Sequence, residues 1–599
     1  MSFDRYIRSR FEACGYVSLD DFYGFPRSQV RSYIRRIVES GEGVVCGRGN
    51  VYSRRFFMDR VGGRIAFTVD DLVWRTNWPR NSVVGVAKKL EYNLVKDFFL
   101  DFMDLRLIEL VSMLSKFDPW DNVFVASAFA SGIVFQGTCD LGLLAKLDRL
   151  FKIWYEGYHA ERSHVRDRFP PGPYRPLIVP IGLILRGCGE EGFDILTQYS
   201  NCGGVGVLVG FFSMLAFDGY GEEVVLEKLE EVITRDYRSY PPSFIKGALL
   251  GASYVLRGTG NERLYEVLKS FLSGEWFKRH LPREWVLLSV DKDANEWVKR
   301  FLETLVYSIG LLFQGSGNLE VLDDIPKVYR GDVAGFVLQG RVREAIDYFQ
   351  DKVEEYPISF GIALWKTGSR EAFDMLKEKL FDEDGDIRLD YLESLSLIFD
   401  ASNNKDILNL LSKYIEESAF STGKKLSFPP SEIIYNLARI FRGSGNEEIF
   451  SAIDKFFNLW WREENGKKIF IPPRVVGEID LKSEDDYLPW QDYLDILGYY
   501  ALSLGILYHK TGNLRAINYI KNILENSSLG SNNYLYDYEL SHIEEYGVSK
   551  LYDTRHYFGL AIGLIIGDIV KPRYEFPIGL LRLDPEVINF DQELLIINI

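Results

Sequence analysis

Cationic and amide side chains recur between residues 27 and 35 at the spacing of one helix face. Val30, Ile34 and Ile37 repeat every three to four residues, which predicts a helix with one buried stripe. The side away from this stripe carries polar residues, namely Arg27, Ser28, Gln29, Arg31 and Arg35. A guanidinium group can hold a phosphate or the O6/N7 edge of guanine, and a glutamine amide can pair with adenine. This face therefore has the chemistry to recognise a nucleic-acid groove.

A glycine-rich segment after this helix adds further arginines. Two short β-prone runs flank the turn of residues 47–50, which predicts a β-hairpin. Arg48 lies at its tip, and its returning strand leads to Arg54 and Arg55. Phosphates attract arginine whatever the base sequence, so we expect these three side chains to contact a nucleic-acid backbone.

The charge of the chain is divided between its two ends. Residues 1–96 hold 17 Lys and Arg against 10 Asp and Glu, a net charge of +7, whereas the whole chain of 599 residues carries −16. The remaining residues therefore carry −23. A basic segment on an acidic body is the distribution expected of a nucleic-acid-binding module on a larger scaffold.

The elements that position these arginines occur twice. The pattern Ser18-x-Asp-Asp, a short turn and then Pro26-Arg27 returns as Thr68-x-Asp-Asp and Pro79-Arg80. Ser or Thr caps a first helix, the second Asp completes a capping-box-like pair, and Pro opens a second helix. Each copy thus predicts two short helices joined by a tight turn.

The second copy is a poorer match to groove recognition. Arg80, Asn81 and Lys88 occupy its outward positions, but Val84 and Gly85 face outward where the first copy has Arg31 and Ser32. No hairpin is expected after it, because residues 91–116 continue as an apolar helical pattern. Two interpretations remain open: this copy contacts only the nucleic-acid backbone, or it docks onto the body of the chain.

Helix, turn, basic helix and basic hairpin together resemble the winged helix-turn-helix family of DNA-binding domains. The resemblance covers about residues 3–58, with a possible second copy near residues 66–92. It implies that the second helix enters the major groove and that the hairpin, or wing, touches the backbone or the minor groove. By this resemblance, the residues expected to contact bases are Arg27, Ser28, Gln29, Arg31 and Arg35. Those expected to contact phosphates are Arg48, Arg54 and Arg55.

Residues 118–599 contain a recurring sequence pattern: an apolar helix end, a Gly/Ser/Thr turn, an Asn, and another helix. The clearest copies lie at residues 255–264, 313–321, 441–449 and 508–516. Gly is expected to end one helix in a left-handed conformation, and Asn261, Asn318, Asn446 or Asn513 to cap the next. Units of about 45 residues match the size of HEAT-type helix pairs. The turn also resembles the repeats shared by proteasome and cyclosome scaffold subunits.

The sequence therefore predicts a mostly α fold: a winged helix-turn-helix at residues 1–60, a second helix-turn-helix-like unit and connecting helix at 61–117, and an α-solenoid at 118–599. Interruptions are expected near residues 157–178 and 466–490. A solenoid offers an extended concave surface, so a protein partner is expected there.

Little in the chain indicates catalysis. No phosphate-binding GxxxxGK[ST] motif occurs, so no nucleotide is expected, and no cofactor or metal site is predicted. Two groups of residues are interpreted as ordinary side chains, namely His159, Glu161 and His164, and His542, Glu544, Glu545 and His556. The carboxylates of residues 485–486 are interpreted as part of a solvated face.

The cysteines and the apolar runs bear on where the chain works. Cysteines at positions 14, 46, 139, 188 and 202 form no CxxC pair and are interpreted as small core residues. The apolar run 202–217 is too short to cross a bilayer, and residues 1–12 lack the apolar centre of a signal peptide. We expect a cytoplasmic chain that associates with the nucleoid and makes no membrane contact. The low numbers of Met and Cys hint at a thermophilic source.

Three functions follow as hypotheses. The leading one is a non-catalytic scaffold that binds duplex DNA through the winged helix and a protein through the solenoid, in transcription or chromosome organisation. The alternative is an interaction scaffold whose winged helix binds protein. The third is an all-helical enzyme built as a closed α/α toroid, against which the irregular repeat length argues.

Overall fold

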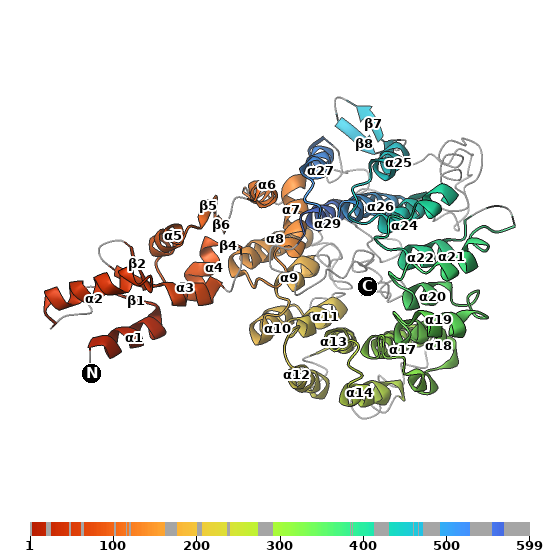
Figure 1. Cartoon of the computed structure of the whole chain (residues 1–599), viewed down its shortest axis with the longest axis horizontal. Helices are drawn as coiled ribbons and strands as arrows, with labels where there is room; N and C mark the ends of the chain where they lie inside the picture. The colour runs from red at the N-terminus through yellow and green to blue at the C-terminus, as the bar shows by residue number, and fades with distance from the viewer. Residues whose placement is uncertain are drawn as a thin grey trace.

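The computed structural model describes most of the chain. The described residues are 3–18, 25–46, 50–61, 65–100, 104–115, 117–118, 121–161, 177–200, 206–235, 240–273, 292–383, 385, 387–411, 430–458, 461–464, 467–470, 491–526 and 554–567. The fold is mostly helical, with small antiparallel sheets near the N-terminus, as the sequence predicts. Figure 1 shows a ring of helices from which an N-terminal arm projects.

The outer half of the arm, here called unit 1 (residues 3–53), has helices on a three-stranded sheet. Its elements are α1 (Phe3–Cys14), β1 (Tyr16–Val17), α2 (Arg27–Glu39), β2 (Gly43–Cys46) and β3 (Asn50–Ser53). The strand order is β1-β3-β2, with β2 and β3 forming the hairpin predicted from the glycine-rich segment. The first helix of the predicted pair falls on residues 19–24, which lie outside the described residues.

The inner half of the arm, unit 2 (residues 54–100), also has helices on a three-stranded sheet. It contains α3 (Arg54–Val61), β4 (Ala66–Thr68), α4 (Val69–Thr76), α5 (Arg80–Lys89), β5 (Asn93–Val95) and β6 (Phe98–Leu100). Its strand order β4-β6-β5 matches that of unit 1. The expectation that no hairpin follows α5 was therefore wrong, and a helix, α6 (Leu105–Met113), begins only later.

The tip of that second hairpin explains why the sequence hid it. Lys96 adopts φ 56°, so the chain reverses through a left-handed residue that is not glycine. Phe98, Phe99 and Leu100 are all buried, on both faces of the sheet. Their continuous apolar run has no alternation, and its period alone does not separate a buried strand from a helix.

The ring has an inner layer of helices, each in contact with the next. These are α7 (Asn122–Val134), α9 (Ile178–Ile184), α11 (Gly206–Leu215), α13 (Pro242–Val255), α17 (Lys292–Leu312), α18 (Arg330–Val337), α20 (Pro357–Ala363), α22 (Leu389–Ile398), α24 (Pro430–Ile440), α26 (Gln491–Leu507) and α29 (Thr554–Ile566). Residues of α7, α9 and α11 are buried all round, as expected of helices covered on every side.

An outer layer of amphipathic helices covers the inner one (Figure 1). These are α8 (Leu141–Glu161), α10 (Gly189–Thr197), α12 (Glu222–Thr234), α14 (Glu262–Leu272), α19 (Val342–Phe349), α21 (Arg370–Lys377), α25 (Glu447–Asn458) and α27 (Leu514–Asn526). The described elements also include two short 3-10 helices, η3 (Leu319–Asp324) and η4 (Lys327–Tyr329), and a hairpin formed by β7 (Trp461–Glu464) and β8 (Lys467–Phe470).

The glycine turns join neighbouring repeats as well as the two helices of one repeat. Gly258 and Gly260 both have positive φ, and their N–H groups donate to the carbonyls of Leu311 and Leu312 at 3.0 and 2.9 Å. The next residue, Asn261, caps α14 by accepting from the N–H of Leu264, as predicted. The same double donation recurs at residues 315/317, 366/368, 401/403, 443/445 and 510/512. Each turn thus satisfies the last carbonyls of the following inner helix.

The helical array closes on itself, contrary to the expectation of an open solenoid. The last described helix, α29, packs along the first inner helix, α7. Gly559 allows this approach, since a Cβ there would lie 2.2 Å from the carbonyl oxygen of Ala126. The ring of His556 stacks on Phe129 with centroids 4.0 Å apart. The repeats differ in length, but each inner helix packs beside the next, so the ring closes without repeats of equal length.

Two of the cysteines form a disulfide, which the sequence analysis did not predict. Cys139 and Cys188 lie in successive turns, their Cα atoms 5.9 Å apart. The turn-to-helix hydrogen bonds stack these turns, so residues 49 apart in sequence meet. Cys14 and Cys46 remain free thiols. Among the described helices, none is both long and apolar enough to cross a bilayer.

Candidate nucleic-acid interface

Helix α2 forms as its periodicity predicts and buries the expected stripe. Val30 and Ile37 are buried against Val17 and Val51 of the sheet, with Tyr33 and Ile34 packed beside them. The helix begins directly after Pro26, and no side chain caps its N-terminus. Its first backbone N–H groups therefore carry the positive end of the helix dipole toward solvent.

The opposite face of α2 is exposed over its whole length. Arg27, Ser28, Gln29, Arg31 and Arg35 all lie on it, as predicted. In the described part of the chain, Arg31 and Arg35 contact no carboxylate. Arg36, at the edge of this face, lies over the ring of Tyr33, 4.9 Å from its centroid. The face is thus cationic, and within the described residues no acidic side chain pairs with its two central guanidinium groups.

The wing residues are placed only in part. Arg48 lies outside the described residues. Arg54 and Arg55 are exposed, but they begin α3 and do not belong to the returning strand. Arg55 lies 4.0 Å from Asp59 one turn later, and both side chains are largely in water. An exposed pair at this distance contributes little, so Arg55 can exchange this partner for a phosphate.

The sheet of unit 1 is covered on both faces. The register pairs Val17 and Val45 with Val51, and these three side chains face α2. It pairs Tyr16 and Val44 with Tyr52, and these face unit 2. Because successive side chains of a strand point to opposite faces, α2 and unit 2 lie on opposite sides of one sheet.

Trp78 fills the joint between the two units. It is 1% exposed and lies edge-on to Tyr52, with ring centroids 4.7 Å apart. Its indole N–H donates to the carbonyl of Cys14 at 2.9 Å. The tryptophan belongs to the turn between α4 and α5, where Asn77 takes a left-handed conformation with φ 54°. The turn of the second copy therefore anchors unit 2 to unit 1.

Helix α5 is held in the same joint. A Cβ on Gly85 would lie 3.3 Å from the sulfur of Cys46, and the Tyr52 hydroxyl donates to Ser82 at 2.7 Å. Lys89 donates to the carbonyl of Val45 on β2. Burial raises the pKa of the Cys46 thiol, partly offset by the charge of Lys89. Val84 and Gly85 look outward from unit 2 but are half-buried because unit 1 packs against this side of α5. Helix α5 thus docks onto unit 1 and not onto the body of the chain, and its contact with a nucleic-acid backbone stays a prediction.

The three predicted binding residues of α5 differ in what they contact. Arg80 forms ion pairs with Asp70 and with Asp97, the latter at 3.1 Å. Asn81 and Lys88 are exposed. Arg80 is therefore already neutralised within unit 2, whereas Lys88 still presents its charge to solvent.

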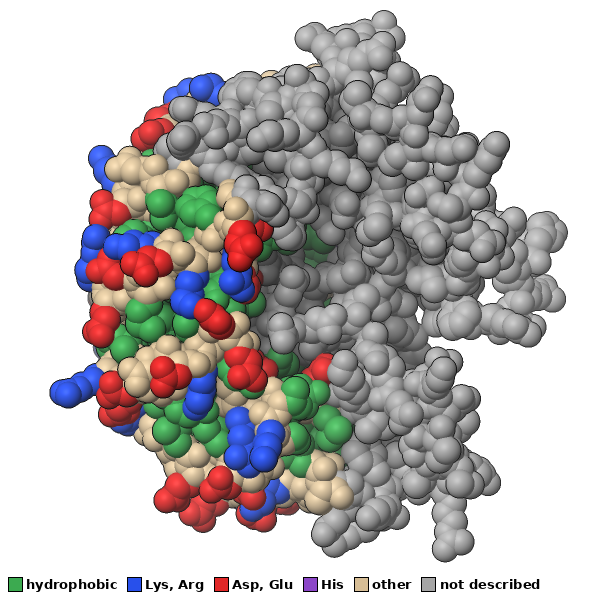
Figure 2. All heavy atoms as spheres, turned by 90° about the vertical axis from the view of Figure 1, so that its right-hand side faces the viewer, with side chains coloured by type: hydrophobic (Ala, Val, Ile, Leu, Met, Phe, Trp, Pro, Cys, Tyr) green, Lys and Arg blue, Asp and Glu red, His purple; other side chains and the backbone are tan. Residues whose placement is uncertain are grey.

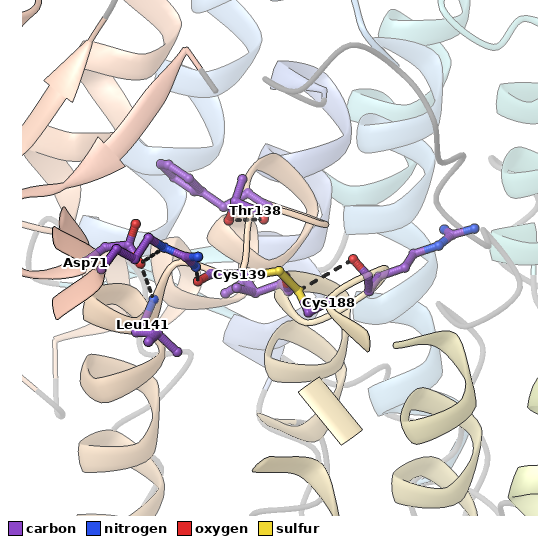
Figure 3. The surroundings of a disulfide bond; sticks show 9 residues. Asp71, Thr138, Cys139, Leu141 and Cys188 are labelled. Carbon is purple, nitrogen blue, oxygen red and sulfur yellow. Dashed lines mark hydrogen bonds and ion pairs between the residues drawn. A yellow bond between two sulfur atoms is a disulfide. The ribbon is translucent and has the colours of Figure 1, made fainter. Parts of the chain in front are cut away.

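A buried polar junction fixes unit 2 to the ring. The N–H and hydroxyl of Thr68 donate to the two carboxylate oxygens of Asp140 at 2.8 and 2.7 Å. Asp71 accepts from the N–H of Leu141 at 3.1 Å and pairs with Arg75 at 2.9 Å, while Arg75 donates to the carbonyl of Cys139. Figure 3 shows Asp71 and Leu141 beside Cys139 and its disulfide partner Cys188. Asp71 thus bonds the ring through Leu141, and the N–H of Thr68, which the capping-box pattern paired with Asp71, donates to Asp140.

The ring surface away from the arm has a different electrostatic character. Figure 2 shows Lys and Arg side chains mixed with Asp and Glu on this side. Arg370 pairs with Asp406 at 2.8 Å, and Arg341 with Glu344 at 3.2 Å. The described part of this surface thus mixes charges of both signs, which attract a polyanion less than a face of uniform positive charge does.

The buried carboxylates of the described helices are engaged in structural contacts. Asp400 pairs with Arg442 at 3.0 Å, and Asp332 accepts from the Ser359 hydroxyl at 2.8 Å. No group of three or more His, Cys, Asp or Glu side chains among the described residues could hold a metal ion. His159, Glu161 and His164, and His542, Glu544 and Glu545, have side chains outside the described part.

Comparison with known proteins adds no assignment. Neither the protein-family models nor the curated proteins that were searched match this sequence.

Proposed function

We propose that this chain is a non-catalytic DNA-binding scaffold in which α2 enters the major groove of duplex DNA. The observation that carries the proposal is the exposed cationic face of α2, with Arg31 and Arg35 free of carboxylate partners in the described part of the chain. In unit 2, the order helix, strand, helix, helix and hairpin, with the first strand pairing the last, supports the winged helix-turn-helix interpretation. Unit 1 shares the helix, strand, basic helix and hairpin within its described residues.

The acidic body does not oppose this function, because unit 2 stands between it and α2 (Figure 1). Exposed charges are screened beyond about 8–10 Å at physiological salt. One helix is about 10 Å across. Unit 2 is therefore thick enough to screen the positive potential at α2 from the negative potential of the acidic body. The DNA contacts the tip of the arm, and the ring remains for a protein partner.

The ring provides the second half of the scaffold. Its inner helices are packed into a continuous core, and its outer helices provide a large surface on which a protein partner could lie. We place the chain in the cytoplasm at the nucleoid, in transcription or chromosome organisation. The disulfide suits the intracellular proteins of hyperthermophiles, which are unusually rich in such bonds.

A protein-binding arm is the second candidate, favoured by one observation. Phe25 and Val38 flank the cationic face of α2 and are 37% and 38% exposed. Partly exposed apolar side chains at the rim of a helix face suit a protein groove as well as a thymine methyl group.

The dependence of duplex binding on salt separates these two candidates. The full chain is titrated with a fluorescent duplex at several salt concentrations. DNA binding predicts that log affinity falls linearly with log salt, with a slope steeper than about −3 if four or more phosphates are neutralised. A flat salt dependence, or no duplex binding, contradicts the proposal. A fragment of residues 1–96 is unsuitable, because it removes β6, the central strand of unit 2.

A further inference from the structure

Tandem helix-turn-helix units raise the question of how many grooves one chain can read. Both units carry a helix in the position of a groove-reading helix, α2 in unit 1 and α5 in unit 2. If both read DNA, one chain would occupy two half-sites about one helical turn apart. The packing of the arm decides between one groove and two.

The two helices lie on opposite faces of the unit 1 sheet. Val30 and Ile37 of α2 pack on the face formed by Val17 and Val51. Helix α5 packs against β2 on the other face, where Gly85 meets Cys46. The exposed face of α2 therefore points away from α5.

The middle of α5 has no free face for DNA bases. Its buried stripe, Val83, Val86 and Ala87, packs into the core of unit 2. Its other broad side, at Val84 and Gly85, is covered by β2 of unit 1. A helix enclosed by its own core and by a neighbouring sheet cannot insert into a major groove about 12 Å wide.

The C-terminal end of α5 remains accessible beside the wing. Lys89 donates to the carbonyl of Val45, one residue before the end of β2, from which the chain enters the wing. Lys88 precedes it on the exposed surface and contacts no carboxylate in the described part of the chain. These lysines place positive charge beside the end of β2, and ammonium groups act there as point charges for phosphates.

On the premise that unit 1 binds duplex DNA as proposed above, we infer that one chain reads a single major groove. Helix α2 supplies the base contacts, and the end of α5 adds phosphate contacts on the flank. Unit 2 serves as a bracket that holds unit 1 at a fixed angle to the ring. The recognition element is then one short asymmetric block of duplex, not a pair of half-sites.

The test uses the full chain and two readouts. Selection from a pool of random duplexes gives the preferred base sequence, and hydroxyl-radical footprinting at one chain per duplex gives the protected region. We expect one contiguous preferred block of about 4–6 base pairs and protection centred on one major groove. Two preferred blocks, or two protected major grooves about one helical turn apart on a duplex holding one chain, would overturn the inference.

Substitutions at α5 separate phosphate contact from base reading. Lys88→Ala should weaken preferred and random duplexes by the same factor and lower the salt slope by about 1, leaving the preferred block unchanged. Asn81→Ala should also leave the preferred block unchanged. Arg80→Ala is the matched control, because the Arg80 side chain is already paired with Asp70 and Asp97. A change of preferred bases in Lys88→Ala or Asn81→Ala would show that α5 reads DNA, and so defeat the inference. Loss of salt-dependent duplex binding by the unaltered chain would instead defeat the proposed function itself.

Discussion

The hydroxyl of Thr68 and the carboxylate of Asp140 meet across the junction between arm and ring, 2.7 Å apart and fully enclosed. The same carboxylate accepts from the backbone N–H groups of Thr68 and Leu143, at 2.8 and 2.9 Å. One side chain thus satisfies the start of α4 on the arm and the start of α8 on the ring. We therefore expect this contact to hold the arm against the ring.

Asp140→Ala should therefore loosen the arm. It leaves three buried donors without an acceptor, at a cost to the free energy of unfolding of about 3 kcal/mol or more. Hydrogen exchange should quicken in residues 66–76 and 140–144, while α2 keeps its protection. Asp140→Asn, which retains one acceptor oxygen, should give a smaller effect. Equal protection of α4 in the Ala variant and the unaltered chain would contradict this account of the junction.

The disulfide should stabilise the ring by restricting its unfolded state. It closes a loop of 49 residues, for which the loss of chain entropy corresponds to about 4 kcal/mol. The double variant Cys139→Ser, Cys188→Ser should unfold at a lower urea concentration than the unaltered chain, and dithiothreitol should remove the difference. Cys14→Ser, at a free thiol, is the control. A difference that persists under reducing conditions would show that packing at the serines, not the bond, is responsible.

Helices α11 and α13 should pack too closely at Gly247 to accept an added methyl group. A Cβ on Gly247 would lie 1.9 Å from the carbonyl oxygen of Val207, so α11 and α13 would have to separate. Gly247→Ala should lower the free energy of unfolding by about 2 kcal/mol or more. Gly221→Ala is the control, since φ there is −66° and no atom lies within 4 Å of the added Cβ. Similar thermal unfolding midpoints for both variants would speak against tight packing of the inner layer.

Asp332 should make the ring less stable as pH rises. Burial raises its pKa to about 6, with the Ser359 hydrogen bond opposing this and Glu303 adding to it. The folded state then binds the proton more tightly than the unfolded state, so stability falls between about pH 4 and pH 6 and stays lower above. Asp332→Asn removes this loss, which amounts to about 3 kcal/mol for a shift of this size. Urea midpoints that differ by the same amount at pH 4 and pH 7 would contradict the titration of Asp332.

Local chemistry in the sequence predicted the local structure well. The stripe of α2, the hairpin after it, the Thr68 cap and the Gly-x-Gly-Asn turns are all properties of short segments, and all are present. The exposure of Arg31 and Arg35 followed from the same stripe. Whether these arginines bind DNA stays a prediction.

The features that were missed depend on contacts between distant segments. Ring closure joins α7 to α29, and the disulfide joins two turns that only the stacked repeats bring together. The neutralisation of Arg80 depends on Asp97, which lies on the hairpin that was not predicted. One signal was available in the sequence: Val84 and Gly85, apolar or small on an outward helix face, indicate a covered surface.

The affinity of a double variant for duplex DNA tests the central claim most directly. In Arg31→Ala, Arg35→Ala, both substitutions lie on the exposed face of α2, so the fold should persist, which hydrogen exchange of α2 verifies. Fluorescence anisotropy with the full chain should show affinity about 10- to 100-fold weaker and a shallower salt slope. Arg80→Ala should bind as the unaltered chain does. Unchanged affinity in the double variant, or an equal loss in Arg80→Ala, would contradict groove binding by α2.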